Sequence, residues 1–227
     1  MRLCALLFAA AAVPLCAQPA APYQITYRAY VTGPNLSRAY LNAETVRAVR
    51  SDGSTYESQT TYKLDSSIHT QWRKFELAGG TTVRAIDRLG LESVVHNANA
   101  GAAGAWNRWD PAKSCAVQFN GGRMNQVASI TSETRLGYRT YKIVQQAGPR
   151  HRVTLWRAPA LGCAELGSMA ETLDQQTNRY EMVFEEKVVD VRPGEPNAAL
   201  FVLPRGLKTV SPDELSAEEM AACCYVN

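Results

Sequence analysis

The most constraining feature of the chain is a series of segments in which apolar and polar residues alternate. In residues 23–31, apolar or aromatic side chains occupy every second position, beginning with Tyr23, Ile25 and Tyr27. A period of two residues is typical of a strand with one buried face. A sheet of such strands must curl or be covered to hide that face from water. We therefore expect a curved sheet.

Tight turns join several of these segments into predicted hairpins. Ser51-Asp52-Gly53-Ser54 lies between two of them, and Asp-Gly predicts a type I′ turn there. Two looser hairpins are expected around residues 87–90 and 147–150. Successive hairpins without helical patterns between them favour an antiparallel sheet. Besides residues 23–31, the predicted strands are 46–50, 55–62, 81–86, 91–96, 115–119, 138–145, 152–156 and 180–191.

Helical signals are few. Ser211-Pro212-Asp213-Glu214 is a capping box with proline at the first helical position, and it predicts a short helix near residues 212–222. Another helical turn or two is expected within Asn35 to Glu44. The predicted fold class is mainly β (α+β): a strongly curved antiparallel sheet, an unclosed half-barrel with a few short helices.

The first seventeen residues have the layout of a secretory signal peptide. Met1-Arg2 gives a positive start, residues 3–15 are almost entirely apolar, and a small residue, Ala17, precedes the polar Gln18. We expect residues 1–17 to be cleaved and residues 18–227 to form a single β-rich domain. A membrane-spanning helix needs about 20 apolar residues, so no transmembrane span is expected in the mature chain. The predicted location is secreted or periplasmic.

Charge and motifs exclude several classes of function. The formal net charge is +3. Without Arg2 it is about +2, with no long basic run, so no nucleic-acid partner is expected. No cofactor motif is present, and we expect neither a cofactor nor a metal site.

Four cysteines remain after cleavage: Cys115, Cys163, Cys223 and Cys224. An even number in an oxidising compartment favours structural disulfides over a metal or redox site. A bridge from Cys115 to Cys163 would stabilise the fold by roughly 4 kcal/mol on the chain-entropy model. The adjacent Cys223 and Cys224 are each expected to form a disulfide with a different cysteine, and the sequence leaves the connectivity open.

Tryptophans are the candidate ligand contacts. Trp106 and Trp109 frame Asn107-Arg108 just after a stretch rich in Ala, Asn and Gly. They would cap an apolar cleft or stack on a sugar ring, or else pack into the core and hold that loop. Trp72 is a further candidate. Tyr23, Tyr27 and Tyr30 could line a cavity, but tyrosine is an ordinary strand residue, so we expect all three to pack in the core.

No catalytic arrangement can be read from the sequence. There is no Gly-x-Ser-x-Gly elbow, and the three histidines lie far apart, with His96 and His151 interpreted as exposed strand residues. Glu185 and Glu186 are neighbours on a predicted strand, so their side chains face opposite sides, and we interpret both as solvated charges. No catalytic residue is therefore assigned. A hydrolase with an unfamiliar site near His96 and His151 is the remaining enzymatic alternative.

The C-terminal part resembles a known type of domain. Residues 136–143, Val153-Thr154-Leu155-Trp156-Arg157-Ala158-Pro159, and the run from Gly194-Glu195-Pro196-Asn197 to residues 200–204 occur in the same order as in the outer-membrane lipoprotein carrier type of domain. The match covers about residues 136–210. The resemblance implies a curved antiparallel sheet, an unclosed barrel whose hollow side accepts acyl chains in the carriers. It supplies no catalytic residue.

Two functional hypotheses follow. The first is a non-enzymatic secreted or periplasmic binding protein that holds an apolar or amphipathic ligand, a lipid or lipoprotein acyl chain, or a partner chain, on the concave face of the sheet. The second is a cell-envelope structural or interaction module that binds an envelope protein or glycan and has no small-molecule ligand. The presence of a ligand-sized cavity would distinguish them.

Overall fold

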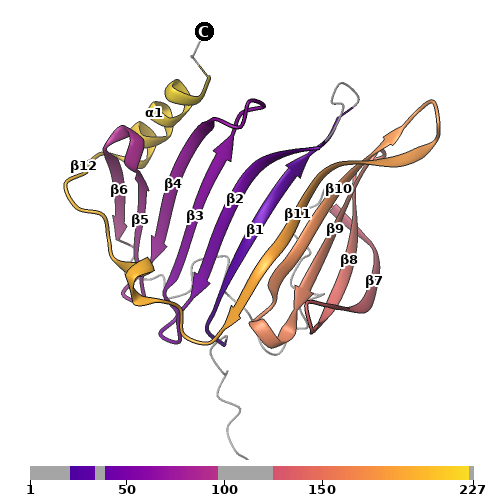
Figure 1. Ribbon diagram of the computed structural model, residues 1–227, viewed down its shortest axis with the longest axis horizontal. Helices are drawn as coiled ribbons and strands as arrows, with labels where there is room; N and C mark the ends of the chain where they lie inside the picture. The colour runs from indigo at the N-terminus through magenta and orange to yellow at the C-terminus, as the bar shows by residue number, and fades with distance from the viewer. Residues whose placement is uncertain (1–20, 34–38, 97–124, 225–227) are drawn as a thin grey trace, which may run out of the picture.

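One sheet of 12 strands forms the body of the protein (Figure 1). The structure, a computed structural model, describes residues 21–33, 39–96 and 125–224. The strand order is β12-β6-β5-β4-β3-β2-β1-β11-β10-β9-β8-β7. The bounds are β1 Tyr23–Val31, β2 Tyr40–Val49, β3 Thr55–Tyr62, β4 Ile68–Glu76, β5 Thr81–Ile86, β6 Leu91–His96, β7 Asn125–Arg135, β8 Tyr138–Ala147, β9 His151–Ala158, β10 Ala164–Asp174, β11 Arg179–Pro193 and β12 Lys208–Thr209.

The predicted fold class is confirmed. Neighbouring strands run antiparallel, except that β12 pairs in parallel with β6 over two residues, which makes the sheet mixed. The sheet is curved and not closed into a barrel (Figure 1). The helices are α1 Pro212–Cys224 and three 3-10 turns, η1 Asp87–Leu89, η2 Pro159–Leu161 and η3 Ala198–Phe201.

The central pairing joins two consecutive series of strands. β1 pairs along its whole length with β2 on one side and with β11 on the other. Strands β1 to β6 therefore form one half of the sheet and β7 to β11 the other, each with sequential neighbours. The first and the last long strands meet in the middle, so the two halves depend on a pairing between distant parts of the chain.

The predicted helix start at Ser211 is confirmed. Ser211 Oγ accepts a hydrogen bond from the backbone N–H of Glu214 at 3.1 Å, and acidic residues occupy the first turn of α1. Helix α1 contacts β6 at one end of the sheet (Figure 1). Its Leu215 is fully buried and packs with Ile86 and Val210. The side chain that fixes the start of the helix therefore lies one turn before the side chain that anchors it to the sheet.

The turn between β2 and β3 differs from the predicted type. Gly53 has φ 84°, but Asp52 is not among the residues with positive φ. The N–H of Arg50 donates to Ser54 O, which leaves three residues in the loop, and the N–H of Gly53 donates to Arg50 O. A three-residue loop uses a type I turn followed by one left-handed residue. The predicted type I′ turn is therefore wrong, although the hairpin is present.

The expected helical turn within residues 35–44 is wrong from Tyr40 onward, because Tyr40–Val49 is a strand paired with both β1 and β3. Four strands are absent from the prediction: β4, β7, β10 and the two-residue β12. β4 and β7 have no apolar alternation, and the register of β10 shifts between Glu165 and Ser168. A shift of this kind interrupts the period of two on which the prediction depends. The predicted strand at residues 115–119 lies outside the described residues.

Both faces of the sheet bury apolar side chains. Tyr23, Ile25 and Tyr27 of β1 are buried with Leu161 and Leu166. A second cluster, on the other face, contains Ala48, Tyr56, Phe75 and Val83, with Leu200 and Phe201 of η3 packed against it. The sheet therefore differs from the expected form with one buried face, because η3 covers part of the second face.

We predict that Phe75→Ala lowers the free energy of unfolding by about 3–5 kcal/mol, since it removes a fully buried ring. That ring lies 5.3 Å from the Tyr56 ring, centroid to centroid. Urea denaturation followed by circular dichroism measures the change. Leu64→Ala is the control, because Leu64 is 67% exposed and its loss should cost less than about 0.5 kcal/mol. Equal effects of the two changes would contradict the assignment of this core.

Candidate functional site

Two segments of the chain cover the two ends of one face of the sheet, which we call the inner face. At the β5–β6 end the cover is α1, whose Glu219 pairs with Arg84 of β5. At the other end, the corner formed by β9, η2 and β10 folds back, so that the hydroxyl of Tyr27 donates to the backbone oxygen of Glu165 at 2.9 Å. β11 lies between β1 and β10. A contact that spans β11 requires the sheet to curl toward this face.

Charged side chains cross the inner face between the two covers. Residues directly opposite each other in antiparallel strands share a face. Arg47 lies opposite Glu57, Glu57 opposite Lys74, and Lys74 opposite Arg84. We call this row of four residues, with its partners Glu76, Glu186 and Glu219, the charged band. It extends from β11 across β1 to β5 and reaches α1.

Each cation of the charged band has a carboxylate partner. Lys74 Nζ lies 2.6 Å from Glu76 Oε1, and Arg84 Nη2 lies 2.6 Å from Glu219 Oε2. Arg47 lies between two acids, with Nε 3.4 Å from Glu57 Oε1 and Nη1 3.9 Å from Glu186 Oε2. The side chains of Arg47, Glu57, Lys74 and Arg84 are 30–35% exposed. They are held in place and still reach solvent.

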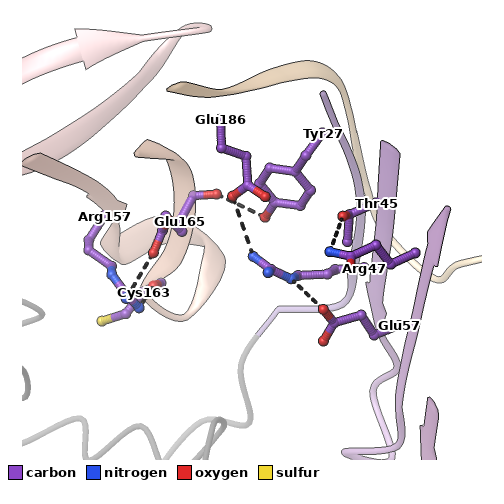
Figure 2. A network of polar contacts seen from close by, with 9 residues as sticks. Tyr27, Thr45, Arg47, Glu57, Arg157, Cys163, Glu165 and Glu186 are labelled. Carbon is purple, nitrogen blue, oxygen red and sulfur yellow. Dashed lines mark hydrogen bonds and ion pairs between the residues drawn. The ribbon is translucent and has the colours of Figure 1, made fainter. Parts of the chain in front are cut away.

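The network around Arg47 continues into the β9–η2–β10 corner (Figure 2). The guanidinium carbon of Arg47 lies 4.8 Å from the centroid of the Tyr27 ring. Beyond Tyr27, Arg157 Nη2 pairs with Glu165 Oε2 at 3.0 Å, and both side chains are at most 15% exposed. On the other side, the amide of Gln59 donates to Thr45 Oγ1 at 3.3 Å. The network joins both halves of the sheet.

The network around Arg47 contains more acids than arginines, and burial shifts the pKa of several of its groups. Two arginines, Arg47 and Arg157, lie among three glutamates, Glu57, Glu165 and Glu186. Burial raises the pKa of the Glu186 carboxyl to about 6, against the lowering effect of Arg47. Burial also raises the pKa of Tyr23 to about 12 and raises that of Tyr27. Burial therefore favours the protonated form of the Glu186 carboxyl.

The solvated interpretation of Glu186 is wrong. Glu185 and Glu186 do face opposite sides, as predicted, but Glu186 is only 8% exposed and faces Arg47. Glu185 pairs with Lys187 at 3.1 Å. The sequence carries no signal for this difference, because the partner of Glu186 lies on β2, far away in the chain.

Of the predicted ligand contacts, the structure describes Trp72 alone. Its half-buried ring packs against the Ile86, Val210 and Leu215 cluster beneath α1, with Arg84 5.8 Å from the ring centroid. Trp106 and Trp109 lie outside the described residues. Tyr23 and Tyr27 are buried, as predicted. The prediction is wrong for Tyr30, which is only half-buried and has Lys187 Nζ 5.7 Å from its ring centroid.

The cysteine pairing stays a prediction. Cys163 is buried and is not a free thiol. The side chains of Cys115, Cys223 and Cys224 lie outside the part of the chain that the structure describes, so no partner can be named.

The structure places the two histidines of the hydrolase alternative on separate strands, β6 and β9. His96 and His151 are exposed, on different strands, and each contacts a threonine hydroxyl at 3.1 Å. Within residues 21–33, 39–96 and 125–224, no group of three or more His, Cys, Asp or Glu side chains could hold a metal ion. In the same ranges, no helix is both long and apolar enough to cross a membrane.

Several solved structures are similar to this one at low sequence identity. The Pseudomonas aeruginosa MucA/MucB complex matches with a TM-score of 0.46 and 13% identity, over 85% of this chain and 59% of that chain. An uncharacterised conserved protein from Thermus thermophilus matches with a TM-score of 0.45 and 12% identity, over 85% of this chain and 91% of that chain. A putative outer membrane lipoprotein-sorting protein domain from Vibrio parahaemolyticus matches with a TM-score of 0.29 and 9% identity, over 79% of this chain and 89% of that chain.

The putative lipoprotein-sorting domain among them is of the type that residues 136–210 resemble. The chain spans about three fifths of the MucB chains that it matches. No protein-family model matches the chain. No curated protein matches it either.

We predict that Glu186→Gln stabilises the protein at neutral pH. Because its pKa is raised from 4.5 to about 6, the Glu186 carboxyl binds its proton more tightly in the folded state. Its contribution to stability is therefore greatest below pH 4.5 and is lost as the pH rises through 6. Glutamine imitates the protonated form, so the variant should gain about 1–2 kcal/mol at roughly pH 7.5 and little at about pH 4.5.

Urea denaturation at both pH values measures this difference. Glu185→Gln is the matched control, because it removes the neighbouring carboxylate from the opposite face. It should show no comparable dependence on pH. Destabilisation by Glu186→Gln at the higher pH would show instead that the ion pair with Arg47 outweighs the cost of burial.

Proposed function

We propose that the protein is a non-enzymatic binding module of the cell envelope that contacts a partner protein through the charged band on its inner face. The predicted signal peptide supports an extracytoplasmic location. The separation of His96 and His151 on different strands leaves the hydrolase alternative without a paired site, which favours a binding role. The observation that carries the proposal is the band itself.

The charged band fits a polar partner. Its side chains alternate in sign between Arg47, Glu57 and Lys74, and they are partly exposed in fixed positions. Charges arranged in advance lose little conformational entropy when a partner binds, and they select a partner with the complementary pattern. A polypeptide segment with its own charged side chains satisfies both conditions.

An acyl chain fits the same surface less well. Hydrocarbon laid across β2 to β5 would take Arg47, Glu57, Lys74 and Arg84 out of water without giving them new hydrogen-bond partners. Removing charged groups from water in this way is costly. Carriage of a lipid or a lipoprotein acyl chain is therefore the alternative with less support on this part of the inner face.

Site-specific crosslinking in the producing cell tests the proposal. A photoreactive benzoylphenylalanine at Gln59, on the inner face, should give an adduct with a partner protein. The same residue at Ser58, which faces the opposite side of β3, is the matched control and should not. Adducts from both positions, or from neither, would contradict partner binding at the inner face.

A charge exchange tests whether the band selects the partner. The triple variant Arg47→Glu, Glu57→Arg and Glu186→Gln keeps an ion pair between β2 and β3 and avoids a second carboxylate beside Glu186, but it reverses the pattern presented to a partner. We expect the Gln59 adduct to fall at least tenfold while the thermal midpoint stays close to that of the wild type. An unchanged adduct would show that the charges do not select the partner.

Native mass spectrometry with organic extraction examines the lipid alternative. The mature protein would be purified from an oxidising compartment and analysed before and after extraction. A stoichiometric lipid that the charge exchange does not displace would favour the acyl-chain hypothesis over the proposed function.

A further inference from the structure

Two cations stack on one buried tryptophan on the face opposite to the charged band. Trp156 of β9 is 8% exposed and lies opposite Lys142 of β8 in the sheet register. The guanidinium carbon of Arg135, from β7, lies 3.9 Å from the centroid of the indole, and Lys142 Nζ lies 5.7 Å from it. Trp156 alternates with Arg157, whose side chain belongs to the inner-face network. The cluster therefore lies on the outer face.

Each of the other described cations that stack on an aromatic ring also has a carboxylate partner, unlike the two cations of this cluster. Arg84 stacks on Trp72 and pairs with Glu219, and Arg152 stacks on Tyr180 and pairs with Glu171. The same holds for Arg47, Arg50, Arg73 and Lys187, which pair with Glu57, Glu195, Asp87 and Glu185.

Arg135 and Lys142 have no ion-pair partner among the described residues. Glu133, the acid beside them on β7, forms no ion pair with either. Two like charges over one ring repel each other, and an anion would relieve that repulsion. The cluster therefore has an excess of positive charge that nothing else described in the chain neutralises.

The cluster also contains an unused hydrogen-bond donor. Trp156 Nε1 is buried and has no hydrogen-bond partner among the described residues. A buried donor without a partner costs about 1–3 kcal/mol. Such groups in native proteins call for an explanation, of which a missing ligand is one. Three donors with a joint charge of about +2 thus lie within one cluster.

Arg135 is held in its position by the neighbouring strands. Its Nη1 lies 3.5 Å from the backbone oxygen of Leu166, and a Cβ added to Gly167 would lie only 2.8 Å from the same nitrogen. Gly167 has φ 129°, a conformation that other residues rarely adopt. The glycine therefore leaves the space in which the guanidinium lies between Trp156 and β10. The cation is fixed before any ligand arrives.

We propose that Arg135, Lys142 and Trp156 form a binding site for a phosphate group. A phosphate carries up to two negative charges and several acceptor oxygens, which matches two cations and one N–H better than a single carboxylate does. The group belongs either to free phosphate or to the headgroup of an anionic lipid. The site is independent of the charged band and of the partner proposed for it.

Titration with inorganic phosphate, observed by NMR, tests the site directly. The chain has four tryptophans, so four indole N–H signals are expected, and loss of one in Trp156→Phe assigns that residue. We expect the Trp156 signal to shift on addition of phosphate. The dissociation constant should rise at least tenfold in Arg135→Gln and in Lys142→Gln, and Lys142→Arg should retain binding. Arg152→Gln is the matched control, because it removes a cation that stacks on Tyr180, and it should leave phosphate binding unchanged.

Sedimentation with vesicles separates the two sources of phosphate. Binding to phosphatidylglycerol vesicles but not to phosphatidylcholine vesicles, lost in Lys142→Gln, would assign the site to a lipid headgroup. Binding of inorganic phosphate alone would assign it to the free ion. Lys142 lies on the surface of β8, so Lys142→Gln keeps the test valid if Arg135→Gln does not fold. The proposal is overturned if the wild type binds neither probe, or if Lys142→Gln binds as well as the wild type.

Discussion

The antiparallel pairing of β1 with β11 is the interaction on which the rest of the sheet depends. It joins the halves β1–β6 and β7–β11, which otherwise consist of neighbours in sequence. Pairing of strands so far apart in the chain requires a large loss of chain entropy before any contact is gained. The buried row of Tyr23, Ile25 and Tyr27 lies on this central strand, and its packing against Leu161 and Leu166 offsets that loss.

The same central pairing assembles the charged network. Glu186 is carried on β11 and Arg47 on β2, with β1 between them, and Arg157 and Glu165 arrive from β9 and β10. Buried charges of this kind contribute little net stability, because the cost of removing them from water offsets their attraction. Under the proposed function, their presence across the inner face serves binding rather than stability.

Much of the fold could be predicted from local patterns. The alternation in β1, the hairpin of β5 and β6 and the cap of α1 each depend on residues close together in the chain, and all three are present as expected. β4 and β7 were missed because their exposed or charged positions leave no apolar alternation. The candidate site was missed almost entirely. No local signal distinguishes Glu186 from Glu185, or Arg135 from any other surface arginine.

The sequence by itself determined the class of fold, the start of the last helix, the burial of Tyr23 and Tyr27 and the exposure of His96 and His151. These properties follow from the period of two and from residue chemistry within a few positions. Tertiary structure alone decided which charges meet, because ion pairs and stacked cations form between strands that the sheet order brings together. It decided, for the same reason, that Arg84 finds a carboxylate beside Trp72 while Arg135 and Lys142 meet only the ring of Trp156.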